Sequence, residues 1–243
     1  MNARPRVAIV TGGSRGLGRA IAAGLRAGGW ALVLDARDAG TLRTSEEGLR
    51  RDGAASAPII SIPGDVNDPA HREALAGAAR ELGGLDLLVN NAGVLGPSPL
   101  PPLAHYPLDG LREVVEVNVV APLALFQATA ELLRAAPDGG RVVMITSDAA
   151  AEAYPGWGGY GAAKAAVEQL AAVLAAEEPG LRVWAVDPGD LRTRMHQEAF
   201  PGEDISDRPE PETVVPAFLG LVESDRASGR VRLADLEAGQ SSR

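Results

Sequence analysis

The chain has 243 residues, of which 46% are hydrophobic and 23% are charged, so it is long enough to bury a sizeable core as one α/β domain. Its formal net charge of −9 disfavours nucleic acids and anionic membranes as partners, because both require a basic surface. The chain has no cysteine, and its three histidines lack metal-ligand spacing, which argues against disulfides, a thiol nucleophile and a metal enzyme.

The amino terminus shows no targeting segment. Its first residues, MNARPR, lead directly into a strand-like apolar run without a signal-type region. No stretch comes close to the about 20 consecutive apolar residues that are needed to cross a bilayer. No linker divides the chain, so we expect one cytoplasmic domain over residues 1–243 that has no membrane partner.

Short apolar runs alternate along the chain with longer helical patterns. The runs lack polar alternation, as is typical of strands that are buried on both faces. This order predicts a doubly wound, Rossmann-like parallel sheet of about seven strands with helices on both faces. The predicted strands are 7–11, 31–35, 59–63, 86–90, 141–146 and 182–187, and the predicted helices are 16–28, 41–51, 69–82, 108–135 and 158–177.

The segment TGGSRGLG, residues 11–18, follows the first predicted strand and opens the first predicted helix. Gly12, Gly16 and Gly18 allow a tight turn that brings backbone N–H groups and the helix N-terminus against a pyrophosphate. The spacing is GxxxGxG rather than GxGxxG. The position of the turn between a strand and a helix indicates a dinucleotide-binding site.

Tyr160 and Lys164 lie four residues apart in an Ala-rich stretch that should be helical, which places them on one face, roughly 5–6 Å apart at Cβ. At ~6 Å and an effective dielectric constant near 20, the ammonium would stabilise a tyrosinate by roughly 3 kcal/mol. Lys164 is the only lysine in an arginine-rich chain, which indicates a need for a compact ammonium. Ser147 directly follows the predicted strand 141–146, where α/β sheets place their chemistry.

Together with the segment NNAG at residues 90–93, these motifs resemble the short-chain dehydrogenase/reductase family over roughly residues 5–195. The resemblance implies an NAD(P)-dependent oxidoreductase that interconverts a carbonyl and a secondary alcohol, here an NADPH-dependent reductase. In the implied mechanism Tyr160 is the acid and base, and Lys164 lowers its pKa and holds the nicotinamide ribose. Ser147 orients the substrate carbonyl.

The resemblance also assigns a fourth catalytic residue and the cofactor contacts. Asn118, in EVNVVAP, corresponds to the residue that holds a water of the proton relay. Taken singly, Asp65 could instead cap the next helix, Asn118 could be a satisfied core amide, and residues 188–189 could be only a turn. The implied cofactor-binding residues are Thr11, Gly12, Ser14, Arg15, Gly16, Leu17, Gly18, Arg37, Asp65, Val66, Asn90, Ala92, Gly93, Tyr160, Lys164, Pro188, Gly189 and Thr193.

The choice between NADP(H) and NAD(H) depends on LVLDARD, at the end of the second predicted strand. Asp35 falls near the spacing at which an acidic residue binds a ribose 2′-hydroxyl. By the family pattern, however, the discriminating acidic position is Ala36, and Arg37 and Arg15 match positions that bind a 2′-phosphate. Two arginines suit a phosphate because they form planar, charge-assisted contacts. We therefore favour NADP(H), with NAD(H) as the alternative.

Two irregular segments, 96–107 and 189–211, interrupt the alternation of strands and helices, and long loops at this edge of a sheet commonly cover ligands. We expect a mobile substrate lid around residues 190–211. Asp148 would give the substrate pocket an acidic edge that disfavours carboxylates, but the identity of the small carbonyl or alcohol substrate stays open. The expected apolar residues near the cleft are Tyr154, Trp157, Met195 and Phe200.

The carboxyl-terminal sequence, GRVRLADLEAGQSSR, departs from the Val-Asp-Gly-Gly-like segment by which relatives pack as tetramers. The helices that contain Asn118 and Tyr160 could still pair, so we expect a homodimer. Two other function classes are a non-catalytic NADP(H)-sensing or scaffold protein and an S-adenosylmethionine-dependent methyltransferase. The intact set of four catalytic residues argues against the first, and a methyltransferase has no use for the Tyr-Lys pair.

Overall fold

The computed structural model describes residues 4–52 and 57–240. In this part of the chain seven strands form one sheet in the order β3-β2-β1-β4-β5-β6-β7, and every strand is parallel to its neighbours. The sheet is doubly wound as predicted, because the chain builds outward in both directions from the adjacent β1 and β4. The strands are β1 Val7–Val10, β2 Ala31–Ala36, β3 Ile59–Pro63, β4 Leu87–Asn90, β5 Arg141–Ile145, β6 Arg182–Asp187 and β7 Gly229–Arg232.

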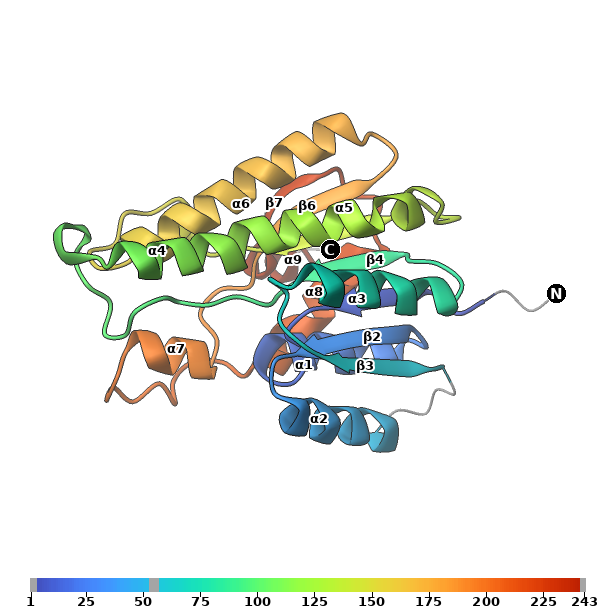
Figure 1. The fold of residues 1–243 in the computed structure, drawn as a ribbon, viewed down its shortest axis with the longest axis horizontal. Coiled ribbons are helices and arrows are strands. Elements are labelled where there is room, and N and C mark those ends of the chain that lie inside the picture. Colours follow the sequence, from blue (N-terminus) through green and yellow to red (C-terminus); the bar gives the residue numbers. More distant parts are fainter. Residues whose placement is uncertain (1–3, 53–56, 241–243) are drawn as a thin grey trace.

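Helices cover both faces of the sheet (Figure 1). The buried clusters show that α1, α2 and α8 pack on one face, and that α3, α5 and α6 pack on the other. Three short 3₁₀ segments, η1, η3 and η4, lie in the connections of the described chain. The helical bounds are α1 Gly16–Ala27, α2 Ala39–Asp52, α3 Pro69–Glu81, η1 Leu103–His105, α4 Leu108–Val115, η2 Glu116–Val120, α5 Ala121–Arg134, η3 Asp148–Ala150, α6 Gly158–Glu177, α7 Arg194–Ala199, η4 Pro211–Val214, α8 Val215–Glu223 and α9 Leu233–Gln240.

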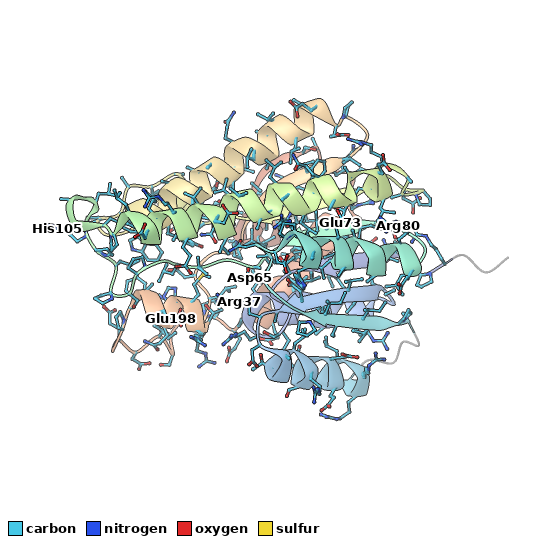
Figure 2. The ribbon with its side chains drawn as sticks, viewed as in Figure 1. Arg37, Asp65, Glu73, Arg80, His105 and Glu198 are labelled. Atoms are coloured by element: carbon cyan, nitrogen blue, oxygen red, sulfur yellow. The ribbon has the colours of Figure 1, made fainter. Side chains whose placement is uncertain are left out.

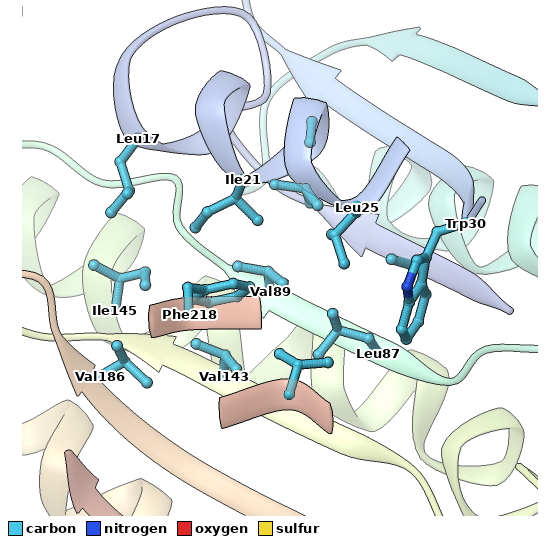
Figure 3. Packing of buried hydrophobic residues seen from close by; sticks show 14 of the residues in the cluster. Leu17, Ile21, Leu25, Trp30, Leu87, Val89, Val143, Ile145, Val186 and Phe218 are labelled. Carbon is cyan, nitrogen blue, oxygen red and sulfur yellow. The ribbon is translucent and has the colours of Figure 1, made fainter. Parts of the chain in front are cut away.

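The apolar runs of the sequence are explained by burial on both faces of the sheet. Leu87 and Val89 of β4 face α1 and α8, whereas Leu88 between them faces α3 and α5, because successive side chains of a strand point to opposite faces. Figure 3 shows Phe218 of α8 packed among these strand residues, and its side chain is completely buried. Burial of such a side chain contributes about 2–3 kcal/mol to folding.

The predicted helix 108–135 is interrupted by one π-helical turn, η2, between α4 and α5. In this turn the Ala121 N–H donates to the Glu116 carbonyl, five residues back. Our expectation of no span-like stretch was wrong for Leu108–Arg134, which has the length and composition of a membrane span. Half of its most apolar stretch is nevertheless buried, and it packs against α3 and α6 as a core helix.

The carboxyl-terminal third contains elements that we did not predict. Helix α8 is so uniformly apolar that no helical periodicity stands out in VPAFLGLVE. Strand β7 is short and its exposed positions are arginines, because it is the edge strand of the sheet. The segment 190–211, which we expected to be poorly anchored, contains α7 and places Leu191 in the main hydrophobic core.

Candidate active site

A cleft of about 900 Å³ opens at the carboxyl ends of the strands. The fold topology explains the position of this cleft. The chain leaves β1 and β4 in opposite directions along the sheet, and a crevice forms between the two connections. The glycine-rich turn after β1 and the residues around Tyr160 line the same cleft, although they are far apart in sequence. The predicted residues that line it are Gly12, Ser14, Arg15, Gly16, Leu17, Gly18, Arg37, Asp65, Val66, Ala92, Gly93, Ser147, Tyr160, Lys164, Pro188, Gly189 and Thr193.

The glycine-rich turn leaves the start of α1 open to the cleft. Gly12 has φ of +67°, a conformation that side chains other than hydrogen disfavour. A Cβ at Gly18 would lie 2.4 Å from the Gly12 carbonyl oxygen, so only glycine permits this close packing. The N-cap residue Arg15 makes no side-chain cap bond to α1. The first N–H groups of α1 therefore lack a side-chain acceptor and suit a phosphate.

Thr11 and Asn90 do not line the cleft, contrary to the cofactor contacts that the resemblance implied. The Thr11 hydroxyl accepts from the backbone N–H groups of Asn91 at 3.0 Å and Ala92 at 2.9 Å, and so holds this segment beside the turn. Asn90 is the last residue of β4, and its buried amide donates to the Met144 sulfur at 3.3 Å. Asn91 lines the cleft instead, because successive residues at a strand end face opposite ways.

At the end of β2, Asp35 and Arg37 have different surroundings. Asp35 is 1% exposed, and its two carboxylate oxygens contact the Gly12 N–H at 2.7 Å and His71 Nε2 at 3.1 Å. These contacts make Asp35 a support of the turn. Arg37 and Arg15 are exposed at the cleft, and within the described residues neither forms an ion pair with a carboxylate.

Asp65 lies beside Arg37 at the adjacent ends of β3 and β2 (Figure 2). Its carboxylate accepts from the Asn67 N–H at 2.9 Å. Asp68, not Asp65, caps α3, since the Asp68 carboxylate accepts from the Ala70 N–H at 2.9 Å and Pro69 occupies the first helical position. Asp65 therefore remains available at the cleft.

Ser147, Tyr160 and Lys164 come together where β5 and the first turns of α6 meet. The Ser147 hydroxyl donates to Asp148 Oδ1 at 2.9 Å and accepts from the Ala149 N–H at 3.2 Å, which starts η3. The Lys164 ammonium donates to the Ile145 carbonyl at 2.9 Å and lies 5.4 Å from the centroid of the Tyr160 ring. Tyr160 is 7% exposed, and no described residue hydrogen-bonds its hydroxyl.

The pKa of Tyr160 is raised in this structure, whereas we expected Lys164 to lower it. Burial raises this pKa above its ordinary value, and the negative charges of Asp148 and Asp187 raise it further. Burial also lowers the pKa of Lys164 to about 8. The physical reason is that both side chains leave water, which disfavours tyrosinate and ammonium alike. Tyr160 is thus a neutral proton donor in this structure.

Asn118 lies in the π-helical turn, 1% exposed and behind the cleft wall. Its amide oxygen accepts from the Val94 N–H at 2.9 Å, and its amide nitrogen donates to the Val94 carbonyl at 2.8 Å. Both hydrogen bonds go to Val94, as is expected of an amide that is satisfied within the core. A π turn shifts the helical hydrogen bonds by one residue, so a relay water would depend on a main-chain carbonyl here.

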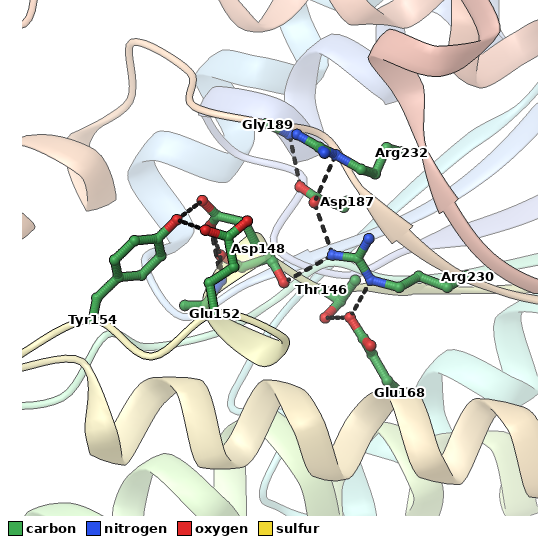
Figure 4. Close-up of polar contacts among 11 residues, drawn as sticks. Thr146, Asp148, Glu152, Tyr154, Glu168, Asp187, Gly189, Arg230 and Arg232 are labelled. Carbon is green, nitrogen blue, oxygen red and sulfur yellow. Dashed lines mark hydrogen bonds and ion pairs between the residues drawn. The ribbon is translucent and has the colours of Figure 1, made fainter.

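Sequence reasoning missed a cluster of polar contacts beneath Ser147 (Figure 4). Arg230 of β7 donates to Glu168 at 2.8 Å, to Asp187 at 3.0 Å and to the Ser147 carbonyl at 3.4 Å. Asp187 also accepts from the Gly189 N–H at 3.0 Å. Arg230 therefore links the segment after β5 with β6 and α6, but nothing in the sequence GRVR signals that role.

The other end of the cleft is aromatic, as expected. The Trp157 ring lies 5.8 Å from that of Tyr160 and 6.0 Å from that of Phe200, and Met195 packs with them. Thr193 caps α7 by accepting from the His196 N–H at 3.2 Å. The segment that we expected to be a lid thus contributes directly to this wall.

The chain resembles proteins whose activities are known. The family model described as short chain dehydrogenase matches residues 6–204. The chain is 37% identical over 197 residues to a rhamnolipids biosynthesis 3-oxoacyl-acyl-carrier-protein reductase of Pseudomonas aeruginosa, spanning 78% of this chain and 74% of that protein. It is 36% identical over 202 residues to sepiapterin reductase of Rattus norvegicus, spanning 79% and 77%. An alcohol dehydrogenase from Thermococcus sibiricus, solved with 5-hydroxy-NADP, has a TM-score of 0.82 at 26% identity, covering 93% of this chain and 95% of that one.

Proposed function

Because the chain belongs to the short-chain dehydrogenase/reductase family, we propose that it is an NADPH-dependent reductase of a small carbonyl compound. The family consists of nicotinamide-dependent oxidoreductases that act on carbonyl and CH–OH groups, which removes the methyltransferase alternative. No observation favours a non-catalytic sensor or scaffold. The reduction direction is supported by the neutral Tyr160, since reduction needs a proton donor at the carbonyl oxygen.

The cleft fits a dinucleotide. Its volume of about 900 Å³, the close-packed Gly18 and the uncapped start of α1 all favour a bound pyrophosphate. Val66 and Gly93 would flank the adenosine, and Pro188, Gly189 and Thr193 would meet the nicotinamide end. A nicotinamide cofactor supplies the hydride for carbonyl reduction.

NADP(H) is supported over NAD(H) by the charges near β2. Arg37 and Arg15 offer two guanidinium groups that form no ion pair in the described chain, although Asp38 lies within electrostatic range of Arg15, and such groups suit a dianionic phosphate. Asp35, the residue that would favour a ribose hydroxyl, already has both oxygens engaged by Gly12 and His71. The solved alcohol dehydrogenase with 5-hydroxy-NADP is consistent with this preference.

The catalytic residues have distinct tasks in this proposal. Tyr160 donates a proton to the carbonyl oxygen, and Ser147 donates a hydrogen bond to the same oxygen after releasing Asp148. Lys164, fixed by Ile145, contributes a positive charge that stabilises the tyrosinate as it forms and would hold the ribose. Asn118 fixes the π-helical turn against Val94, where a relay water would bind. The segment 190–211 would cover the substrate.

The observation that carries the proposal is the unpartnered hydroxyl of the largely buried Tyr160 side chain, which lines the cleft with Ser147 and Lys164. Tyr160→Phe removes that proton donor and little else. We expect kcat for NADPH-dependent reduction of a ketone panel to fall about 10²–10⁴-fold, with NADPH affinity retained. Steady-state kinetics and calorimetric titration with NADPH measure the two quantities. Full activity in Tyr160→Phe would rule out this mechanism.

A further inference from the structure

Behind the glycine-rich turn, a buried histidine contacts a buried carboxylate. His71 of α3 is 6% exposed, and its Nε2 lies 3.1 Å from Oδ2 of Asp35, the carboxylate near the end of β2. Because a carboxylate offers only acceptors, His71 Nε2 carries the proton at this contact. The other oxygen of Asp35, Oδ1, accepts from the Gly12 N–H at 2.7 Å. The carboxylate is thus fixed from two sides, by the turn and by α3.

The His71 ring has a seat that only glycine allows. A Cβ at Gly64, the residue after β3, would lie 2.2 Å from His71 Nδ1 and 2.6 Å from Cε1. Any other residue at this position would displace the ring. The Gly64 N–H donates to the Ala36 carbonyl at 3.0 Å, so the backbone against which the ring packs is itself bound to β2. The contact between His71 and Asp35 is therefore built into the ends of two neighbouring strands.

Asp35 borders the place where the two cofactors differ. It lines the cleft, as does Arg37 two residues later, whereas His71 does not. A carboxylate at the end of the second strand can accept from a ribose 2′-hydroxyl, and its charge repels a 2′-phosphate. Arg37 and Arg15 have the opposite preference, since they suit the phosphate. The strand end thus carries two conflicting signals, and the contact with His71 occupies the carboxylate oxygen that Gly12 leaves free.

We infer that His71 sets the preference for NADPH over NADH by holding the Asp35 carboxylate toward α3 and away from the ribose. This inference rests on the proposed function, because it explains how that cofactor is selected. His71 is a positioning residue, since it acts on the cofactor only through Asp35. Without the imidazole, Asp35 Oδ2 has lost its donor and becomes an acceptor for a 2′-hydroxyl, and its charge is less well compensated next to a phosphate.

Cofactor binding by His71 variants tests the inference. Calorimetric titration with NADPH and with NADH gives the ratio of the two dissociation constants without any turnover. In His71→Leu, which is of similar size but has no donor, the preference for NADPH should fall about tenfold. His71→Gln should keep it, because its amide N–H can reach the same oxygen. Glu73→Gln, which removes an exposed charge on α3 away from the cleft, should also keep it (Figure 2).

A double variant shows whether His71 acts through the carboxylate. Asp35→Asn keeps an oxygen for the Gly12 N–H but removes the charge, so adding it to His71→Leu should restore the preference for NADPH. A double variant that keeps the lowered ratio would overturn the inference. So would an equal loss of affinity for both cofactors in His71→Leu, which would limit His71 to supporting the turn. Urea unfolding checks that each variant folds, and His71→Ala replaces His71→Leu if leucine prevents folding, with the same expected and contrary results.

A reductase assay on the wild type separates this inference from the proposed function. A wild type that binds both cofactors but reduces no carbonyl compound would contradict the proposed function, and the binding ratios would then support or overturn the role of His71 by themselves. A wild type that binds neither cofactor would contradict both.

Discussion

At the scale of single residues, the buried charge of Lys164 lowers the stability of the folded state. Lys164 is 5% exposed, and burial lowers its pKa from 10.5 to about 8. Since one pKa unit corresponds to about 1.4 kcal/mol, the buried charge destabilises the fold at neutral pH by about 3 kcal/mol. The only lysine of the chain thus occupies a position where a charge is costly, which supports a functional role.

This cost predicts a pH-dependent stability difference. Between about pH 8 and pH 10.5 the unfolded chain binds more protons than the folded chain at Lys164, so the folded state gains stability as the pH rises. Lys164→Met has no such group. From pH 7 to pH 9.5 wild type should gain about 2 kcal/mol relative to Lys164→Met, measured by urea unfolding at both pH values. A constant difference would mean that Lys164 is neutral or well solvated.

Arg37 is expected to decide between the two cofactors. Its guanidinium is exposed at the cleft and has no carboxylate partner within the described chain. Arg37→Ala should lower the ratio of kcat/KM for NADPH to that for NADH at least tenfold, because a charge-assisted contact with the 2′-phosphate is lost. Arg80→Ala, which removes an exposed arginine near the end of α3, is the matched control. An unchanged ratio in Arg37→Ala would assign the phosphate contact to another residue.

At the scale of elements, the edge strand β7 supports the catalytic edge of the sheet. Arg230 is the link, because it contacts Glu168 of α6, Asp187 of β6 and the Ser147 carbonyl. Without it, Asp187 and Glu168 lose a cationic partner that they share, although Asp187 keeps the longer contact with Arg232 at 3.7 Å. Ser147 then loses a restraint on its backbone.

Arg230→Gln should therefore lower kcat about tenfold through misplacement of Ser147, while KM for NADPH changes little. It should also destabilise the fold by about 1–3 kcal/mol, since partly buried carboxylates are left without their partner. Steady-state kinetics and urea unfolding measure both effects. Arg226→Gln, an exposed neighbour of β7, serves as the control. A loss of stability with kcat intact would limit Arg230 to a structural role.

At the scale of the whole molecule, we propose that one domain spanning residues 1–243 assembles as a homodimer through the long helices. Val115 and Val120, on the run from α4 to α5, are 38% and 42% exposed, and Val173 on α6 is 40% exposed. Exposed apolar side chains on neighbouring helices are typical of an interface between subunits.

Light scattering at micromolar concentration should give twice the mass of one chain. The double variant Val120→Arg/Val173→Arg should give a monomer, because two charges would be buried at the contact. The control Val115→Thr, which nearly keeps the side-chain shape and adds no charge, should not dissociate the dimer. A wild-type monomer would show that these valines are only isolated surface residues.

The sequence by itself determined the sheet and the residue types of the site. Six of the strands were predicted within a residue or so of their bounds, because strands buried on both faces must be apolar throughout. The glycine-rich turn was predictable for a similar reason, since Gly12 and Gly18 have conformations or contacts that exclude side chains. Local chemistry was sufficient at these positions.

Only the tertiary structure decided which predicted residues reach the cleft and how burial and neighbouring charges shift their pKa values. The pleat at the end of β4 places Asn90 in the protein interior and Asn91 at the cleft. The Asn118 side chain, in the π turn, forms hydrogen bonds with Val94. Burial raises the pKa of Tyr160, where a count of helix positions predicts a decrease. Arg230 of β7, which is far from Ser147 in the sequence, contacts the Ser147 carbonyl. Each outcome depends on groups far apart in sequence, and desolvation and pairing between such groups exist only once the chain is packed.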